Sequence, residues 1–474
     1  MPFVGRQREL AALDEVLAAT AAGTGRVVLI TGEAGIGKTG LADASCLAAR
    51  ARGLQVAWGR AWDGAPAFGP WIEVWRSLFG EDGPFGRAPP GEQTAAAARG
   101  AQFAVAAERL IATARERPLA IVLDDVDAAD AASLLLALAL GSQAETAPLA
   151  IVATCRSADG GRRDDGAAEL LARLARAALV VPLAGLEPAI VAELVAWRTG
   201  APPGPPVIEA LLAATGGNPF LLDAVIGALG SIPAPAVPLT PRIRDTVTAR
   251  LGRLPGEARA VVDAAAVVGR PVSMALLELI TDLPTSELLP ALDICAAERL
   301  LVAAPGEVDI YGFPHALVRD AVLAALDEVG RLDLHRRVGE ALEILHEGDL
   351  EPHLDELARH VVAAAALVGA DPGIEASCAA AARATACLAY EQAVAHYRRA
   401  LGLAAATSPR RRAELAIRLG DALVAAATAG ATRIDPGWAG VLREALTGLP
   451  DSERELRARV VAGIAALEAG PREA

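Results

Sequence analysis

A single lysine marks the segment of this sequence that is best suited to chemistry. Lys38 is the one lysine among 44 basic residues, and it lies in the segment 32–39, GEAGIGKT. This segment fits the phosphate-binding pattern G-x-x-x-x-G-K-[ST], the P-loop, at every defined position. In such a loop the glycines let backbone N–H groups turn towards phosphate oxygens, the lysine ammonium reaches the β- and γ-phosphates, and the threonine hydroxyl binds Mg²⁺. We therefore predict that Lys38 is catalytic and that Thr39 is a metal ligand.

The residues around this loop predict a strand before it and a helix after it. Residues 26–31, RVVLIT, form a β-branched run typical of a buried parallel strand, and residues 41–52 continue as an alanine-rich helix. The N-terminus of that helix adds a favourable dipole for an anion. An ordinary glycine-rich turn is the alternative interpretation. The residues expected to contact a nucleotide are Gly32, Glu33, Ala34, Gly35, Ile36, Gly37, Lys38, Thr39 and Gly40.

A second strand supplies the acids that such a loop needs. Residues 119–126, LAIVLDDV, place Asp124 and Asp125 directly after an apolar run, in the Walker B form. We predict that Asp124 is a metal ligand and that Asp125 orients or activates the attacking water. The alternative is a buried strand that ends in a solvated pair of aspartates.

A third apolar run carries a candidate phosphate sensor. Residues 149–154, LAIVAT, are followed by Cys155 and Arg156. Ligands of α/β sheets bind at the carboxyl ends of the strands, so Arg156 is a candidate catalytic contact to the γ-phosphate. A surface arginine explains this residue as well.

Composition narrows the class of protein. The formal net charge is −14, which gives the whole chain no electrostatic footprint for nucleic acid. No run of about 18 apolar residues predicts a membrane helix, and the N-terminus lacks the pattern of a secretory signal. The five cysteines have neither disulfide nor metal spacing. We expect a protein without a membrane partner, located in the cytoplasm, with buried thiols.

The 474 residues suggest about three domains, and the pattern along the chain indicates a multidomain α/β plus α fold. Residues 1–185 alternate strands and helices, which predicts a P-loop NTPase domain with a parallel sheet. Residues 186–230 predict a helical lid, and 231–241, with four prolines, a linker. Residues 242–350 are mostly helical with one β-like pair, 300–303 and 308–313, and indicate a winged-helix-like regulatory domain. Residues 351–474 predict helical repeats.

These repeats resemble tetratricopeptide (TPR) helices. In the segment 390–403, YEQAVAHYRRALGL, the spacing of Tyr390 and Tyr397 puts both rings on one helix face. An unrelated helical bundle is the alternative. Because a solenoid needs several repeats and a cap, we expect the set to be incomplete.

As a set, the motifs resemble the STAND class of P-loop NTPases, and within it the ATPase part of the large ATP-binding LuxR-type bacterial regulators. The segments that carry the resemblance are FVGR at 3–6, GEAGIGKT at 32–39, WGR at 58–60, PAFGPWIEVW at 66–75, LDDVDAAD at 123–130, ATCR at 153–156, PLAGL at 182–186, TGGNPF at 215–220 and FPHALVR at 313–319. The family often has His-Trp where Asp127 and Ala128 stand, and Arg where Gly40 stands. Neither departure removes a phosphate or metal ligand.

The resemblance implies further nucleotide contacts. Val4, Gly5 and Arg6 would lie near the adenine, and Pro219 in the TGGNPF signature would contact the base. His315 would contact the β-phosphate of bound ADP from the winged-helix domain. A histidine that begins a helix and bonds to the backbone is the alternative for His315.

The resemblance also implies a function. It predicts an ATP/ADP-binding switch with slow hydrolysis and Mg²⁺, in which an unknown inducer on the repeats drives nucleotide exchange and self-association. Output would be transcriptional, with DNA reached only through a segment or partner absent from this chain. A fast ATPase and a scaffold whose nucleotide is structural are the alternatives.

Overall fold

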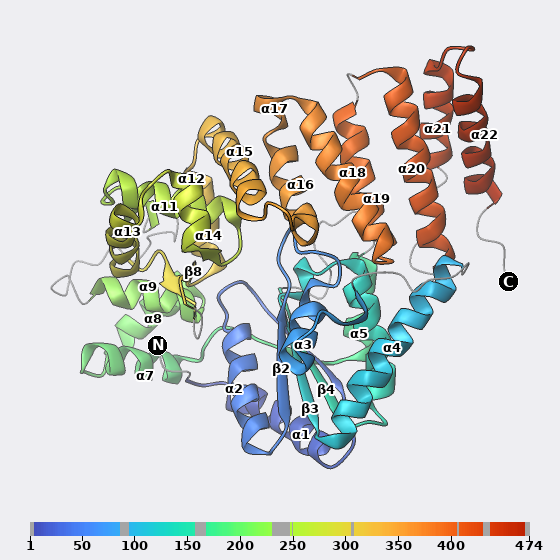
Figure 1. Ribbon diagram of the computed structural model, residues 1–474. Helices are drawn as coiled ribbons and strands as arrows, with labels where there is room; N and C mark the ends of the chain where they lie inside the picture. Colours follow the sequence, from blue (N-terminus) through green and yellow to red (C-terminus); the bar gives the residue numbers. More distant parts are fainter. Residues whose placement is uncertain are drawn as a thin grey trace.

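A computed structural model describes residues 4–85, 94–156, 167–229, 247–248, 250–304, 308–404, 407–429 and 437–469. The predicted linker at 231–241 lies outside these residues. The described chain begins with a sheet covered by helices, continues through two smaller units, and ends in an array of helices that returns over the sheet (Figure 1). The predicted α/β plus α class is confirmed, whereas the domain boundaries stay predictions.

The sheet has five parallel strands in the order β2-β3-β4-β1-β5. The strands are β1 Val27–Thr31, β2 Gln55–Arg60, β3 Leu119–Asp124, β4 Leu149–Cys155 and β5 Leu179–Pro182. Strands β1, β3 and β4 are buried along their whole length, as their apolar β-branched runs predict. The three strands expected at 26–31, 119–123 and 149–154 are thus confirmed.

Successive residues of β1 face opposite sides of the sheet. Val28 and Ile30 pack with α1 and α2, while Val27 and Leu29 pack with α3 to α6. These helices are α1 Gln7–Ala21, α2 Lys38–Ala51, α3 Gly69–Phe79, α4 Ala95–Glu116, α5 Ala131–Ala144 and α6 Ala167–Ala177, with short 3₁₀ helices at Gly83–Phe85 and Val126–Ala128. Strands and helices thus form one layered unit, the sheet unit, with a helical layer on each face.

The next helices form a small unit of their own, the lid helices. They are α7 Pro188–Thr199, α8 Pro205–Thr215 and α9 Pro219–Leu229. Val191, Leu194 and Leu222 make its core, and Val4 from the N-terminal segment packs against that core. This agrees with the helical character that the sequence predicts here.

A winged-helix-like unit follows, built from helices and a three-stranded antiparallel sheet of order β6-β8-β7. Its elements are α11 Gly256–Val268, β6 Val272–Ser273, α12 Met274–Thr281, α13 Thr285–Ala297, β7 Val302–Ala303, β8 Ile310–Gly312 and α14 Ala316–Ala325. The expected β pair is present but shorter than predicted. Sequence analysis missed β6, because two residues are too few to show a period of two.

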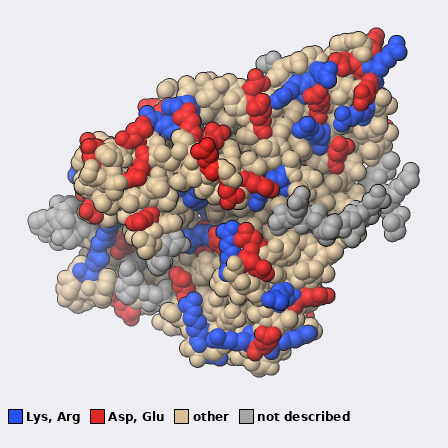
Figure 2. Space-filling view, in the orientation of Figure 1, with Lys and Arg blue, Asp and Glu red and all other residues tan. Residues whose placement is uncertain are grey.

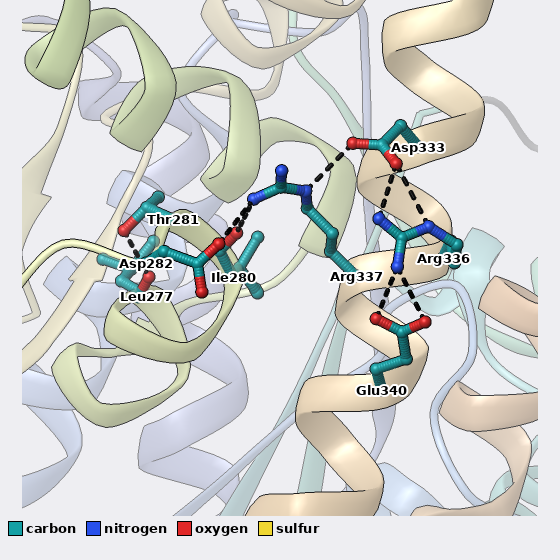
Figure 3. Close-up of polar contacts among 8 residues, drawn as sticks. All are labelled: Leu277, Ile280, Thr281, Asp282, Asp333, Arg336, Arg337 and Glu340. Carbon is teal, nitrogen blue, oxygen red and sulfur yellow. Dashed lines mark hydrogen bonds and ion pairs between the residues drawn. The ribbon is translucent and has the colours of Figure 1, made fainter.

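Helix α15 (Glu328–Leu345) is tied to the end of α12 by Arg337 (Figure 3). Its Nη1 donates to the carbonyl oxygen of Ile280 at 3.2 Å and pairs with Asp282 at 3.0 Å. The carbonyls at a helix end lack partners in their own helix, so Arg337 satisfies one of them. The neighbouring Arg336 instead bonds two residues of its own helix, Asp333 and Glu340.

We expect Arg337→Ala to destabilise the winged-helix-like unit by about 1 kcal/mol, because it removes a bond to a helix-end carbonyl. Arg336→Ala removes exposed pairs within one helix and should change stability by about 0.5 kcal/mol or less. Thermal unfolding of both variants measures the difference. Equal melting temperatures would show that the contact across the two helices contributes nothing.

The remaining helices stack side by side over the sheet unit (Figure 1). After a 3₁₀ helix at Glu351–His353 they are α16 Leu354–Ala363, α17 Ala365–Val368, α18 Ala370–Ala386, α19 Tyr390–Leu403, α20 Pro409–Thr428, α21 Gly437–Gly448 and α22 Arg454–Ala469. We call α16–α22 the repeat helices. One apolar core runs from Leu29 and Leu134 of the sheet unit to Tyr397 and Val460 of the repeat helices. The repeats therefore pack directly on the sheet unit, which the sequence did not predict.

The surface and the cysteines agree with the composition. Basic and acidic side chains are interspersed over the face shown in Figure 2, without a single-sign field. Of the cysteines, Cys378 is half-buried and the other four are buried, and none of the five, all of which lie in the described ranges, forms a disulfide. No helix in the described ranges is long and apolar enough to span a membrane.

Candidate nucleotide-binding site

The P-loop joins β1 to α2 and has the backbone that a phosphate site requires. Gly35 and Gly37 have φ angles of 83° and 100°, which residues with a side chain rarely adopt. Lys38 begins α2, and its Nζ donates to the carbonyl oxygens of Gly32 at 2.9 Å and Glu33 at 3.1 Å. Burial lowers the pKa of Lys38. A buried ammonium that bonds neutral carbonyls is positioned to gain from an anionic partner.

Asp124 lies at the carboxyl end of β3, almost fully buried, at the centre of a polar cluster. The hydroxyl of Thr39 is 3.1 Å from Oδ1, and that of Thr154 donates to the same oxygen at 2.7 Å. Arg60 Nη2 lies 3.2 Å from Oδ2. The structure thus brings the two predicted metal ligands together and adds Arg60 and Thr154.

Sequence analysis did not assign a role to Arg60 or Thr154. Both lie in segments that carry the family resemblance, WGR and ATCR. Their place in these segments was the sequence feature that could have marked them as site residues. Their position follows from register, since Arg60 pairs with Asp124 in the parallel ladder of β2 and β3. Pairing of this kind depends on strand order, which one sequence does not reveal.

Asp125 follows Asp124 in a left-handed conformation with φ of 56°. Its backbone N–H donates to Thr154 Oγ1 at 2.8 Å. Burial, assisted by the charges of Asp124 and Asp127, raises the pKa of the Asp125 carboxyl. A carboxylate with a raised pKa is a better proton acceptor, so this residue fits the predicted role in activating water.

Arg156 comes directly after β4, at the same edge of the sheet. Its backbone N–H donates to Asp127 Oδ1 at 3.2 Å, and its Nε lies 3.5 Å from Asp127 Oδ2. The side chain is 46% exposed. Arg156 is thus held at the edge of the site, and its contact to a γ-phosphate stays a prediction.

The lid and the winged-helix-like unit both reach the P-loop at Gly35. Asn218 Nδ2 donates to the carbonyl oxygen of Ala34 at 2.9 Å, and the ring of Phe220 stacks on that of His315 at 4.3 Å. A Cβ placed on Gly35 would lie 2.9 Å from both Asn218 and Phe220 and 3.3 Å from His315. These approaches leave no room for a side chain at position 35. Three segments of the chain therefore meet at one glycine.

His315 also begins helix α14, as its alternative interpretation predicted. Its Nδ1 accepts the backbone N–H of Leu317 at 3.1 Å. Burial, followed by the charges of Lys38 and Arg156, lowers the pKa of His315 to about 4. The ring is therefore neutral near pH 7 beside the P-loop. Its contact with a β-phosphate stays a prediction.

The remaining predicted contacts lie around the same loop. Gly5 faces the lid, where an added Cβ would lie 3.2 Å from Ile190, and Arg6 Nη2 donates to the carbonyl oxygen of Ile36 at 3.0 Å. Pro219 is half-buried at the start of α9. Contacts thus tie Arg6, Asn218 and His315 to the P-loop, while the roles of the segment 4–6 and of Pro219 at a base stay predictions.

The residues fit a nucleotide with Mg²⁺. The glycine-bent backbone and the buried Lys38 suit phosphate oxygens, and the adjacent oxygens of Thr39 and Asp124 are the hard donors that Mg²⁺ prefers. In the described residues no separate group of three or more metal-binding side chains is present.

Known proteins agree with this geometry. Residues 2–152 match the family model of the AAA ATPase domain. Among solved structures, the chain is similar to a Signal Transduction ATPase with Numerous Domains (STAND) protein with a tetratricopeptide repeat sensor from Pyrococcus horikoshii. The TM-score is 0.50 and the identity 16%, over 98% of this chain and 67% of that chain. The chain has the fold of a STAND protein.

Other comparisons add less. The Aeropyrum pernix ORC2 protein has a TM-score of 0.33 at 15% identity, over 68% of this chain and 95% of that chain. The replication initiator DnaA has a TM-score of 0.33 at 13% identity, over 74% and 94%. Both scores are too low to bear on the fold. No curated protein matches the sequence.

The STAND fold confirms two sequence predictions. The resemblance of the P-loop motifs to the STAND class holds for the fold, and the C-terminal helices form a TPR-like helical array, as the segment at 390–403 indicated. Tyr390 and Tyr397 of that segment are both buried.

Proposed function

We propose that this protein is an ATP/ADP-dependent switch that holds its nucleotide between the P-loop, the lid helices and the winged-helix-like unit. The observation that carries the proposal is the meeting of Asn218, Phe220 and His315 at Gly35. A nucleotide in the P-loop would lie where the loop, the lid helices and the winged-helix-like unit meet. Its phosphates would therefore affect how the lid and the winged-helix-like unit pack on the loop. If the closed and open arrangements of these units bind ADP and ATP with different affinities, then exchange of one nucleotide for the other shifts the population between the two arrangements.

In this proposal, different residues of the site contact the phosphates, the base and the metal ion. Lys38 binds phosphate oxygens, the segment 4–6 and Pro219 enclose the base, and His315 senses the β-phosphate. Mg²⁺, held by Thr39 and Asp124, would supply Lewis-acid charge neutralisation when bound. For Asp124 to bind Mg²⁺, Arg60 must either move away or share this carboxylate with the ion, because the Arg60 guanidinium lies beside Asp124 Oδ2.

Hydrolysis in this proposal resets the switch and is slow. Asp125 takes the proton of the attacking water, and Arg156 contacts the γ-phosphate. Arg156 is engaged by Asp127, which stands where the family often has His, so it has to exchange partners before it acts. Because Arg156 must first break its ion pair with Asp127, we expect a low rate of ATP hydrolysis.

We further infer a regulatory output. Exchange of ADP for ATP, coupled to an inducer, releases the winged-helix-like unit from the P-loop and exposes a surface for self-association. By its resemblance to LuxR-type regulators the protein controls transcription, with DNA bound by another segment or partner. A scaffold and a fast ATPase are the competing functions, and nucleotide turnover separates them.

Gly35→Ala tests the switch. The added methyl group meets Asn218 and Phe220 at 2.9 Å, so we expect the lid and His315 to move away and ADP to dissociate about 10-fold faster or more. Gly53→Ala is the matched control, because its φ of 84° is equally strained but nothing lies within 4 Å. Release of a fluorescent ADP analogue measures both variants.

A second variant excludes a direct effect on the loop. Phe220→Ala removes the ring stacked on His315 and leaves the P-loop sequence unchanged. It should also speed ADP release, and scattering in solution should show a larger radius for both Gly35→Ala and Phe220→Ala. Release at the wild-type rate in both variants would rule out the closed arrangement as the element that retains ADP.

A further inference from the structure

Three side chains take up the acceptor positions of the Asp124 carboxylate. Its Oδ1 lies 2.7 Å from the hydroxyl of Thr154 and 3.1 Å from that of Thr39. Its Oδ2 lies 3.3 Å from Nε and 3.2 Å from Nη2 of Arg60. A carboxylate offers about four lone-pair positions to its partners. A metal ion can therefore bind Asp124 only if one of these partners gives up its place.

The three partners differ in how easily they can leave. Thr154 is fully buried, and its hydroxyl also accepts the backbone N–H of Asp125 at 2.8 Å, so it is held from two sides. Thr39 is the second predicted ligand of the same ion. The side chain of Arg60 is 42% exposed, so its guanidinium can turn into water without the cost of desolvating a charge. Arg60 is thus the partner whose departure costs least.

The backbone from which Arg60 reaches Asp124 is fixed by bonds on both sides of the residue. Arg60 is the last residue of β2 and lies opposite Asp124 in the ladder with β3. Its backbone N–H donates to Glu73 Oε2 at 2.8 Å, and the N–H of Ala61 donates to the carbonyl oxygen of Asp124 at 2.9 Å. Arg60 can therefore leave the carboxylate by rotation of its side chain, while the strand stays in place.

The loop that follows Arg60, residues 61–65, is held by the repeat helices. Gln392 Nε2 of α19 donates to the carbonyl oxygen of Ala65 at 3.2 Å. A Cβ placed on Gly64 would lie 2.7 Å from Nε of Arg359, which belongs to α16. The repeat helices thus support the end of β2 from outside the sheet unit, which keeps the Arg60 side chain within reach of Asp124 for its return.

Charge makes Arg60 and a metal ion alternatives at this carboxylate. Asp124 is 1% exposed, and a buried carboxylate is costly unless a cation compensates it. In the described part of the chain, Arg60 is the side chain that forms an ion pair with it. A divalent cation on the same carboxylate would compensate the charge more strongly and would repel the guanidinium. One cation therefore replaces the other.

We propose that Arg60 is a positioning residue that takes the place of Mg²⁺ at Asp124 and rotates away when the ion arrives with the nucleotide. Arg60 acts through Asp124: it compensates the buried charge and keeps the carboxylate beside Thr39 while the metal is absent. It thereby sets how strongly nucleotide binding depends on Mg²⁺. The inference rests on the metal site of the switch proposed above and requires no change of assembly.

Calorimetric titration of the full chain with ADP, in EDTA and in Mg²⁺, gives the ratio of the two dissociation constants. Arg60→Gln leaves Asp124 uncompensated beside the phosphates in EDTA and removes the competitor in Mg²⁺, so we expect a ratio about 10-fold larger than in wild type. Arg60→Lys keeps a cation and should restore most of the wild-type ratio. Arg52→Gln is the matched control, because Arg52 pairs with Asp14 on the surface at 2.6 Å, and it should leave the ratio unchanged.

A measurement on the wild-type chain does not depend on the folding of any variant. An arginine-specific dicarbonyl reagent, followed by peptide mass spectrometry, gives the rate of modification at Arg60. With ADP in EDTA the guanidinium is bonded to Asp124, whereas with ADP and Mg²⁺ it is released, so we expect several-fold faster modification in Mg²⁺. Arg52 serves as the internal standard and should react equally in both.

The outcomes separate this inference from the switch. A purely structural role of Arg60 would lower the melting temperature of Arg60→Gln and leave the ratio of ADP dissociation constants at the wild-type value. That result, or a modification rate at Arg60 that Mg²⁺ does not change, would overturn the inference while nucleotide binding stands. Failure of wild type to bind ADP in either condition would overturn the switch and this inference together.

Discussion

Replacing Lys38 by alanine should raise the dissociation constant for ADP about 100-fold. The ammonium of Lys38 is buried, where it bonds two loop carbonyls and where burial lowers its pKa. A phosphate replaces those neutral partners by charged ones, and each charge-assisted bond contributes about 1.5 kcal/mol or more. Two such bonds amount to about 3 kcal/mol, which is roughly 100-fold in affinity.

Calorimetric titration with ADP measures this effect, and Glu33→Ala is its control. Glu33 lies in the same loop, but its side chain is exposed and its carbonyl is retained. The composition supplies a second readout, because Lys38 is the only lysine of the chain. An amine-acylating reagent should modify it in the free protein and be excluded by ADP. Unchanged affinity in Lys38→Ala, or acylation unaffected by ADP, would disprove nucleotide binding at the P-loop.

The sequence predicted the parts of this site that are local. The P-loop needs only eight adjacent residues, and the strand before it is visible in its β-branched run. Asp124 and Asp125 follow an apolar run in the same way. In each case one short segment determines both the element and the chemistry, so no knowledge of the fold is required.

Other contacts depend on how distant segments pack. Arg60 reaches Asp124 only because β2 pairs with β3 in one particular register. Asn218 is the only asparagine of the chain and lies in the TGGNPF segment, yet its bond to Ala34 spans 184 residues. Rarity and motif can single out such a residue, but the partner follows only from the fold.

The packing of the repeats on the sheet unit was not predictable at all. Alanine-rich helices offer an apolar face without specifying what covers it. The structure shows one core that includes Leu134 of α5 and Tyr397 of α19. A cavity lined by Asp130, Ala131, Gln392 and Ala395 exists only because of this packing, since its walls come from both parts.

Arg99 carries a deeply buried ion pair between these two parts. It lies on α4, is 4% exposed, and pairs with Glu391 of α19, 292 residues away, at 2.7 Å. It also donates to the carbonyl oxygen of Ala429 at the end of α20. Removing one partner of a buried ion pair leaves an uncompensated charge, which costs about 3–5 kcal/mol.

We therefore expect Arg99→Met to weaken the docking of the repeat helices by about 3–5 kcal/mol, so that they detach at a lower temperature than the sheet unit unfolds. Scanning calorimetry should resolve an early transition, and proteases should cleave the repeats below it. Arg410→Met is the control, because Arg410 pairs with Glu414 and Glu453 on the surface and its loss should be nearly neutral. Adding Glu391→Met to Arg99→Met should recover most of the stability, since apolar residues replace a buried pair without stranding a charge. A single unchanged transition in Arg99→Met would show that the shared apolar core holds the repeats without this pair.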